Sequence, residues 1–227
     1  MIDNYDMLKK SIDEAVYNTK VTDIHTHLYS PGFGDMLLWG MDDMLLYHYL
    51  LAEAFRWLDI SYEDFWELDK KSQADMVWKV LFEDNSPCSE SCKGVLTVLR
   101  RLGADMSNKD LNSFRNIFSQ KKLDEYVDEV FELSGVDTVV MTNDPFDEAE
   151  RRVWLESYVP DDRFKAALRI DPLLLDTENS FDKLKKWGYD VDFALGEKTF
   201  DEVKRFLSDW VTKMGALYMA VSLPDDF

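Results

Sequence analysis

The chain has 227 residues, of which 46% are hydrophobic and 31% are charged, a composition that can bury a sizeable core and argues against global disorder. Its formal net charge is −19, so it repels nucleic-acid phosphates and anionic membrane surfaces, and we expect neither as a partner. No apolar stretch approaches the roughly 18 residues of a membrane-spanning helix and no secretory signal pattern is visible, so the sequence predicts a cytoplasmic globular protein.

Short apolar runs predict the strands of a parallel sheet. Each run is β-branched or apolar nearly throughout and is bounded by polar or helix-ending residues, which is typical of strands covered on both faces. The predicted strands are residues 21–28, 137–142, 164–170 and 217–223. Between them, periodicity and capping signals predict helices over residues 5–18, from 42 to about 58, from 87 to 103, over 123–134, and from 199 to Gly215.

The spacing of these elements predicts an α/β fold of the (β/α)8 barrel type. Helices alternate with parallel strands, and a stretch on the order of a hundred residues, largely helical, separates the first two strands. We interpret residues 35–135 as a helical insertion after the first strand, and residues 1–227 as one portion of a single barrel domain. A closed barrel needs about 250 residues before insertions, so we expect this to be the N-terminal half of a longer protein.

All three histidines lie early in the chain, at His25, His27 and His48. His25 and His27 are two residues apart on the first predicted strand, so both imidazoles project from the same face. Two nitrogen donors at the carboxyl end of a barrel strand suit a Zn²⁺-like divalent ion. The alternative is a pair of histidines that are only hydrogen-bonded, and a metal site requires a further ligand from elsewhere.

His48 and Tyr49 lie on the helix predicted after the first strand. Surrounded by leucine and tyrosine, His48 can pack at the edge of the core, and the spacing by itself favours that interpretation. The functional alternative makes His48 or Tyr49 a proton carrier, or a group that binds a substrate hydroxyl beside the metal.

Several segments together resemble uronate (glucuronate) isomerases, a family of the amidohydrolase superfamily of β/α barrels. They are VTDIHTHL at 21–28, LLYHY at 45–49, Ala52-Glu53, MTNDPFD at 141–147, ALRIDP at 167–172 and AVSLP at 220–224. The histidine pair alone is unspecific, whereas its combination with TNDPFD and ALRIDP is far more specific. The resemblance runs from about residue 5 to the last residue and implies a barrel of amidohydrolase type, truncated to about its first half.

The resemblance implies an aldose–ketose isomerase of uronate catabolism. Such enzymes interconvert D-glucuronate with D-fructuronate, and D-galacturonate with D-tagaturonate, by moving a proton between C2 and C1. His25 and His27 would be metal ligands, with Zn²⁺ the expected ion, and His48 and Tyr49 would contact substrate hydroxyls as catalytic and binding residues. Arg169 would line the site and bind the sugar acid's carboxylate, although an ion pair with Asp171 is an equally good interpretation.

The resemblance also implies parts that this sequence does not contain. The family's remaining metal ligand, an Asp at the end of the eighth strand, has no counterpart here, and the general base stays unassigned. We expect the full-length protein to be a homo-oligomer. The alternatives are a metal-dependent hydrolase of the amidohydrolase type, disfavoured because the third and fourth predicted strands carry no histidine, or an inactive truncated fragment.

Overall fold

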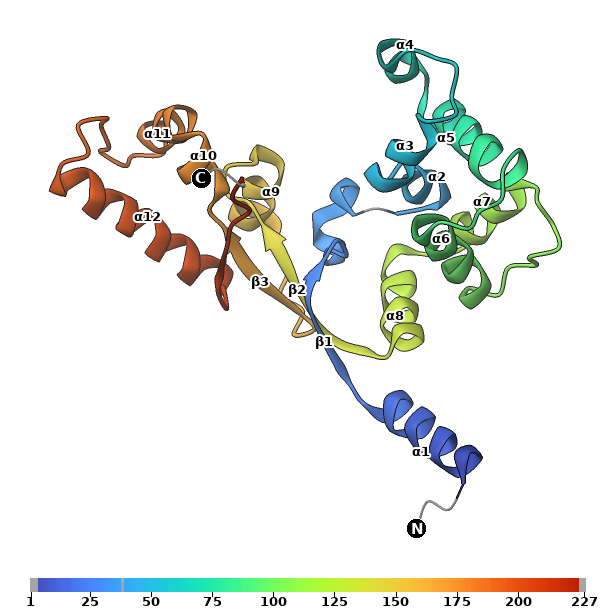
Figure 1. The fold of residues 1–227 in the computed structure, drawn as a ribbon. Coiled ribbons are helices and arrows are strands. Elements are labelled where there is room, and N and C mark those ends of the chain that lie inside the picture. The colour runs from blue at the N-terminus through green and yellow to red at the C-terminus, as the bar shows by residue number, and fades with distance from the viewer. Residues whose placement is uncertain (1–3, 38, 225–227) are drawn as a thin grey trace. The chain divides into compact units, whose positions relative to one another are not determined.

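The computed structural model describes residues 4–37 and 39–224, which form two compact units. The first unit comprises Met1–Leu37 and Ser134–Phe227 and carries the sheet. The second unit, Leu38–Leu133, carries the run of helices from α2 (Met41–Leu45) to α8 (Leu123–Ser134) in Figure 1. Throughout the described part of the chain, every helix is too short or too polar to cross a membrane.

The first unit is built on a parallel sheet whose strands follow one another in chain order. The strands are β1 Val21–Thr26, β2 Val136–Asn143, β3 Phe164–Arg169 and β4 Met219–Ala220. Sequential parallel neighbours joined by helices are the arrangement of part of an α/β barrel, which confirms the predicted class at this level. In β2 and β3, consecutive residues are buried, as expected of strands covered on both faces.

The fourth strand is shorter than the sequence predicts. The prediction covered residues 217–223, whereas only Met219 and Ala220 pair in register with β3. Apolar composition marks a segment as able to form a strand, but strand length is set by the ladder of backbone hydrogen bonds to a neighbour. The residues after Ala220 form no regular element as far as Pro224, the last described residue.

Helices in the first unit connect the strands, and one of them packs against the sheet. Figure 1 shows this helix, α12 (Glu197–Met214), running alongside β3. Its buried face includes Phe206, Trp210 and Met214, and it ends at Gly215 with a φ of 58°, the left-handed cap predicted before the fourth strand. The elements are α1 Tyr5–Asn18, η1 Pro31–Met36, α9 Glu148–Arg152, η3 Val153–Ser157, α10 Asp171–Leu175, α11 Thr177–Lys186 and α12 Glu197–Met214.

The second unit is a helical body with its own core. Its elements are α2 Met41–Leu45, α3 His48–Ala54, α4 Tyr62–Glu67, α5 Lys70–Trp78, η2 Lys79–Glu83, α6 Glu90–Arg101, α7 Leu111–Ser119 and α8 Leu123–Ser134. Side chains from seven of these elements, α2 to α7 with η2, meet in one cluster, among them Leu45, Phe65, Val77, Leu99 and Phe114. Each of these five is at most 2% exposed, so the unit can be held together by its own apolar burial.

Two helix boundaries in this unit differ from the prediction. The helix expected from residue 42 to about 58 is two helices, because Tyr47 adopts an extended backbone (φ −63°, ψ 137°) and starts α3. The helix expected from Pro87 begins at Glu90 instead. Ser89 accepts a hydrogen bond from the Cys92 N–H, and this cap fixes the start of α6.

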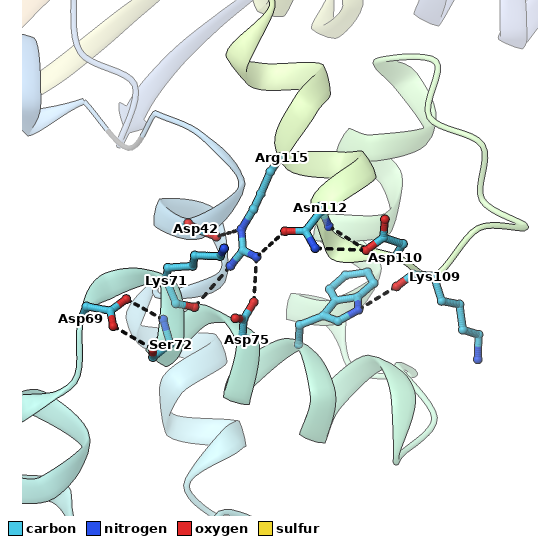
Figure 2. Close-up of polar contacts among 10 residues, drawn as sticks. Asp42, Asp69, Lys71, Ser72, Asp75, Lys109, Asp110, Asn112 and Arg115 are labelled. Atoms are coloured by element: carbon cyan, nitrogen blue, oxygen red, sulfur yellow. Dashed lines mark hydrogen bonds and ion pairs between the residues drawn. The ribbon is translucent and has the colours of Figure 1, made fainter.

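One arginine joins three helices of the second unit, as Figure 2 shows. The Arg115 guanidinium on α7 binds Asp42 on α2 and Asp75 on α5, each at 2.7 Å. Its Nη2 donates to the Lys71 carbonyl at 3.2 Å, and its Nη1 donates to Asn112 Oδ1 at 3.2 Å. The Arg115 side chain is only 16% exposed, so these contacts are a substantial polar link between helices.

Candidate active site

An irregularity in β1 places the two strand histidines. The register between β1 and β2 shifts between Asp23 and Thr26, and Asp23 Oδ1 accepts a hydrogen bond from the His25 N–H at 3.0 Å. Such bulges re-aim side chains next to functional sites. The His25 and His27 rings lie 5.5 Å apart, centroid to centroid, at an interplanar angle of 88°, and both residues are exposed. The structure therefore brings together the two imidazoles that the sequence singled out.

A cavity of about 250 Å³ opens where the four strands end, and we call it the strand-end cavity. Its walls include His25, His27, Tyr29, Thr142, Arg169 and Ser222. These residues come from the carboxyl end of β1, from β2 and β3, and from the segment after β4. Three of the predicted site residues, the two histidines and the arginine, thus share one cavity although they are far apart in sequence.

Arg169 forms the predicted ion pair and also lines the cavity. Its Nε donates to Asp171 Oδ2 at 2.9 Å, and this bond raises the pKa of the guanidinium. Burial opposes ionisation of Asp171, but Arg169 and the Ser222 N–H, which donates at 2.8 Å, hold the carboxyl pKa below its usual range. The Arg169 side chain remains 44% exposed, so it is accessible to an anion while Asp171 fixes its direction.

Sequence reasoning missed a buried pair behind this cavity. The Tyr29 hydroxyl lies 3.3 Å from the Thr142 carbonyl and 3.5 Å from Glu150 Oε1. Glu150 is 7% exposed, and its Oε2 accepts hydrogen bonds from Asn143 Nδ2 and the Asp144 N–H, both at 2.9 Å. Burial raises the pKa of the carboxyl to about 7 against the effect of these two donors. Burial, and then the charge of Glu150, raises the pKa of Tyr29.

The local sequence explains why Glu150 was overlooked. Asp147 caps α9 by accepting from the Ala149 and Glu150 N–H groups, so Glu150 occupies the third helical position, where a capping box places an exposed Glu. The side chain points instead to the turn after β2. In that turn Asp144 Oδ1 accepts from the Phe146 N–H at 2.8 Å, the turn chemistry that Asn-Asp-Pro predicts.

A solved structure is similar to this chain over nearly its whole length. No protein-family profile and no curated protein matches the chain. Among solved structures, the crystal structure of a uronate isomerase from Bacillus halodurans C-125 is 51% identical over 99% of this chain, with a TM-score of 0.95. Over nearly its whole length, this chain is similar to a uronate isomerase. It spans about half the length of that solved relative, of which the match covers 53%.

Two further residues to which the uronate isomerase resemblance gives roles lie in the second unit. His48 and Tyr49 begin α3, and both side chains are exposed rather than packed in the core. Their rings contact each other, with centroids 4.2 Å apart, and each also contacts the Tyr47 ring. That they contact a substrate in the strand-end cavity stays a prediction.

The donor atoms at the strand-end cavity are of the type that zinc prefers. Imidazole nitrogen is a ligand that Zn²⁺ prefers, and His25 and His27 present two such groups side by side. Within residues 4–37 and 39–224, no cluster of three or more His, Cys, Asp or Glu side chains could hold a metal ion. Catalytic zinc sites use three protein ligands in most cases, so the described residues of this chain would supply only part of such a ligand set.

Proposed function

We propose that this chain forms part of an enzyme that interconverts D-glucuronate with D-fructuronate, and D-galacturonate with D-tagaturonate. One observation carries the proposal: in a chain similar to a uronate isomerase over nearly its whole length, the strand-end cavity joins His25, His27 and Arg169. The carboxyl ends of the strands are where barrel enzymes place their chemistry. The proposal includes a barrel of the amidohydrolase type and a homo-oligomeric full-length protein, both on the family resemblance, and the cytoplasmic location that the sequence pattern predicts.

Arg169 is proposed to bind the carboxylate of the sugar acid. In a chain of net charge −19, an anionic substrate requires a local cation, and Arg169 is the cation in the wall of the strand-end cavity. The hydrogen bond that Arg169 donates to Asp171 leaves the guanidinium pre-oriented, so little side-chain entropy is lost when a carboxylate binds. We propose that this contact sets which end of the sugar lies near the histidines.

His25 and His27 are proposed to hold a divalent metal ion, with Zn²⁺ the best fit to their nitrogen donors, together with a further ligand from outside the described residues. When bound, such an ion polarises the oxygen atoms on the carbons that exchange the proton. His48 and Tyr49 are proposed to contact the substrate hydroxyls and to carry protons during transfer between C2 and C1. An imidazole and a phenol are both able to donate and accept hydrogen bonds in this role.

The test uses the purified full-length protein with Zn²⁺ and D-glucuronate in D₂O, with NMR detection of ketose and of deuterium incorporated at C2. We expect deuterium incorporation, and we expect Arg169→Met to weaken the apparent uronate affinity by about 10-fold or more, the worth of a charge-assisted hydrogen bond. Arg163→Met is the matched control. Arg163 pairs with Asp161 at 2.8 Å across the same two-residue spacing before β3, and it is not in the cavity wall.

Two results would count against the proposal. One is wild-type protein that neither binds a uronate nor exchanges the C2 proton when zinc is supplied. The other is equal loss of affinity in Arg169→Met and Arg163→Met, which would assign the effect to strand stability rather than to carboxylate binding.

A further inference from the structure

Glu150 is a buried carboxyl group at the back of the strand-end cavity. Its Oε2 is fixed by two donors at 2.9 Å, the Asn143 amide and the Asp144 N–H, so Oε1 is the oxygen that faces the Tyr29 hydroxyl at 3.5 Å. Tyr29 and Thr142 both line the cavity, and Glu150 itself does not. A side chain held this firmly one layer behind a cavity wall is placed to orient the residue in front of it.

We propose that Glu150 is a positioning residue, which sets the direction of the Tyr29 hydroxyl and thereby the hydrogen bond that Tyr29 offers to a sugar hydroxyl in the strand-end cavity. The part that concerns the sugar rests on the proposed function. The part that concerns Tyr29 rests on the contacts of Glu150 alone.

The geometry allows two orientations of the Tyr29 hydroxyl proton, one for each protonation state of Glu150. With Glu150 ionised, the Tyr29 O–H donates to Oε1. With Glu150 protonated by solvent, the carboxyl O–H donates to the Tyr29 oxygen, and the tyrosine proton turns to the Thr142 carbonyl at 3.3 Å. Tyr29 keeps its own proton in both arrangements. What changes is which lone pair of its oxygen remains for a ligand.

The groups around Glu150 make both arrangements accessible near neutral pH. Burial, followed by the negative charges of Asp144 in the turn after β2 and Asp147 at the start of α9, raises its pKa to about 7. The hydrogen bonds from Asn143 and the Asp144 N–H act in the opposite direction. Tyr29, after β1, is the third titratable neighbour. A modest change of pH near neutrality thus changes the protonation of Glu150.

The first experiment observes Tyr29 without any substrate. The full chain is labelled with ¹³C at the tyrosine ζ carbon, and its Tyr29 signal is assigned by Tyr29→Phe. Between about pH 5 and about pH 9 we expect a shift of this signal with a midpoint near 7. Glu150→Gln should abolish the step, because its amide mimics the protonated carboxyl. Glu148→Gln, an exposed acid on the same helix, should retain it. A flat wild-type signal, or a step that persists in Glu150→Gln, would overturn the proposal.

The second experiment measures uronate affinity against pH by calorimetry. We expect the wild-type affinity to change about 3-fold or more across the Glu150 midpoint, and the Glu150→Gln affinity to vary much less, since one neutral hydrogen bond is worth about 1 kcal/mol. Tyr29→Phe, which removes only the hydroxyl, should show weaker affinity with the same flattened profile. An unchanged profile in both variants would overturn the positioning role. If wild-type protein binds no uronate, the proposed function fails, and the labelled-tyrosine result still decides whether Glu150 orients Tyr29.

Discussion

Replacing Arg115 tests whether the polar link of the second unit stabilises it. Arg115→Met keeps most of the aliphatic stem, and it removes the guanidinium that binds Asp42, Asp75 and the Lys71 carbonyl (Figure 2). The matched control is Lys70→Met. Lys70 binds Asp43, the neighbour of Asp42 on α2, at the same 2.7 Å distance. The two ion pairs therefore differ chiefly in the exposure of the cation, which is 16% for Arg115 and 61% for Lys70.

The expected magnitude follows from these exposures. Asp75 is 51% exposed, so its pair with Arg115 is screened by water and contributes less than about 1 kcal/mol. Asp42 is 23% exposed, and a charge-assisted bond of this burial contributes about 1.5–3 kcal/mol. We expect Arg115→Met to lower the free energy of unfolding by about 2–3 kcal/mol. Lys70→Met should lower it by less than about 1 kcal/mol.

Urea unfolding of the full chain gives the overall change, and hydrogen exchange locates it. Because the chain has two compact units, a single two-state transition cannot be assumed, and exchange is followed in peptides from α2, α5 and α7. Arg115→Met should speed exchange in these helices and leave β2 and β3 unchanged. Equal losses of stability in Arg115→Met and Lys70→Met, or faster exchange confined to the sheet, would refute the reasoning from burial.

Three further predictions concern the first unit. The pKa of Glu150 is raised from 4.5 to about 7 in the folded protein, so wild-type protein should lose up to about 3 kcal/mol of unfolding free energy between about pH 4.5 and pH 7. In urea titrations Glu150→Gln should therefore become more stable than wild type as the pH rises, and the same gain in Glu148→Gln would contradict this assignment. Phe206→Ala, at a fully buried position, should cost about 3–5 kcal/mol of unfolding free energy by urea titration, and a cost below about 1 kcal/mol would mean that α12 is not docked. Gly215→Ala should cost about 1–2 kcal/mol by thermal unfolding, because a Cβ there meets no neighbouring atom and only the left-handed backbone is strained; no loss would show that the cap relaxes.

The strands and the histidine pair could be predicted because they depend on local pattern. Continuous apolar runs mark strands buried on both faces, and β2 and β3 begin and end within a residue or so of the predicted bounds. His25 and His27 are neighbours in the chain, so strand geometry was enough to place their rings together. Arg169 was recognised from the ALRIDP motif. Its ion pair with Asp171 is confirmed and its side chain lines the cavity, while its binding of a carboxylate stays a prediction.

The helix boundaries were less predictable because competing caps and turns decide them. Ser86-Pro87 is a good start signal, but Ser89 is the residue whose hydroxyl caps α6. The apolar periodicity across residues 42–58 continues through Tyr47, where the backbone turns out of the helix. In both cases several local conformations are close in energy, and packing against the rest of the helical unit selects one of them.

By itself, the sequence determined the class of fold, the family resemblance and the residues that carry a recognisable motif, because these follow from periodicity, spacing and residue type. Only the tertiary structure decided which residues are buried next to the motif and which hydrogen bonds they form. Glu150 has the sequence context of an exposed capping residue, and it becomes a buried carboxyl with a pKa of about 7 because Tyr29, Asn143 and the Asp144 N–H converge on it from other segments. Burial and hydrogen-bond partners depend on contacts between residues far apart in the chain, and no local pattern encodes them.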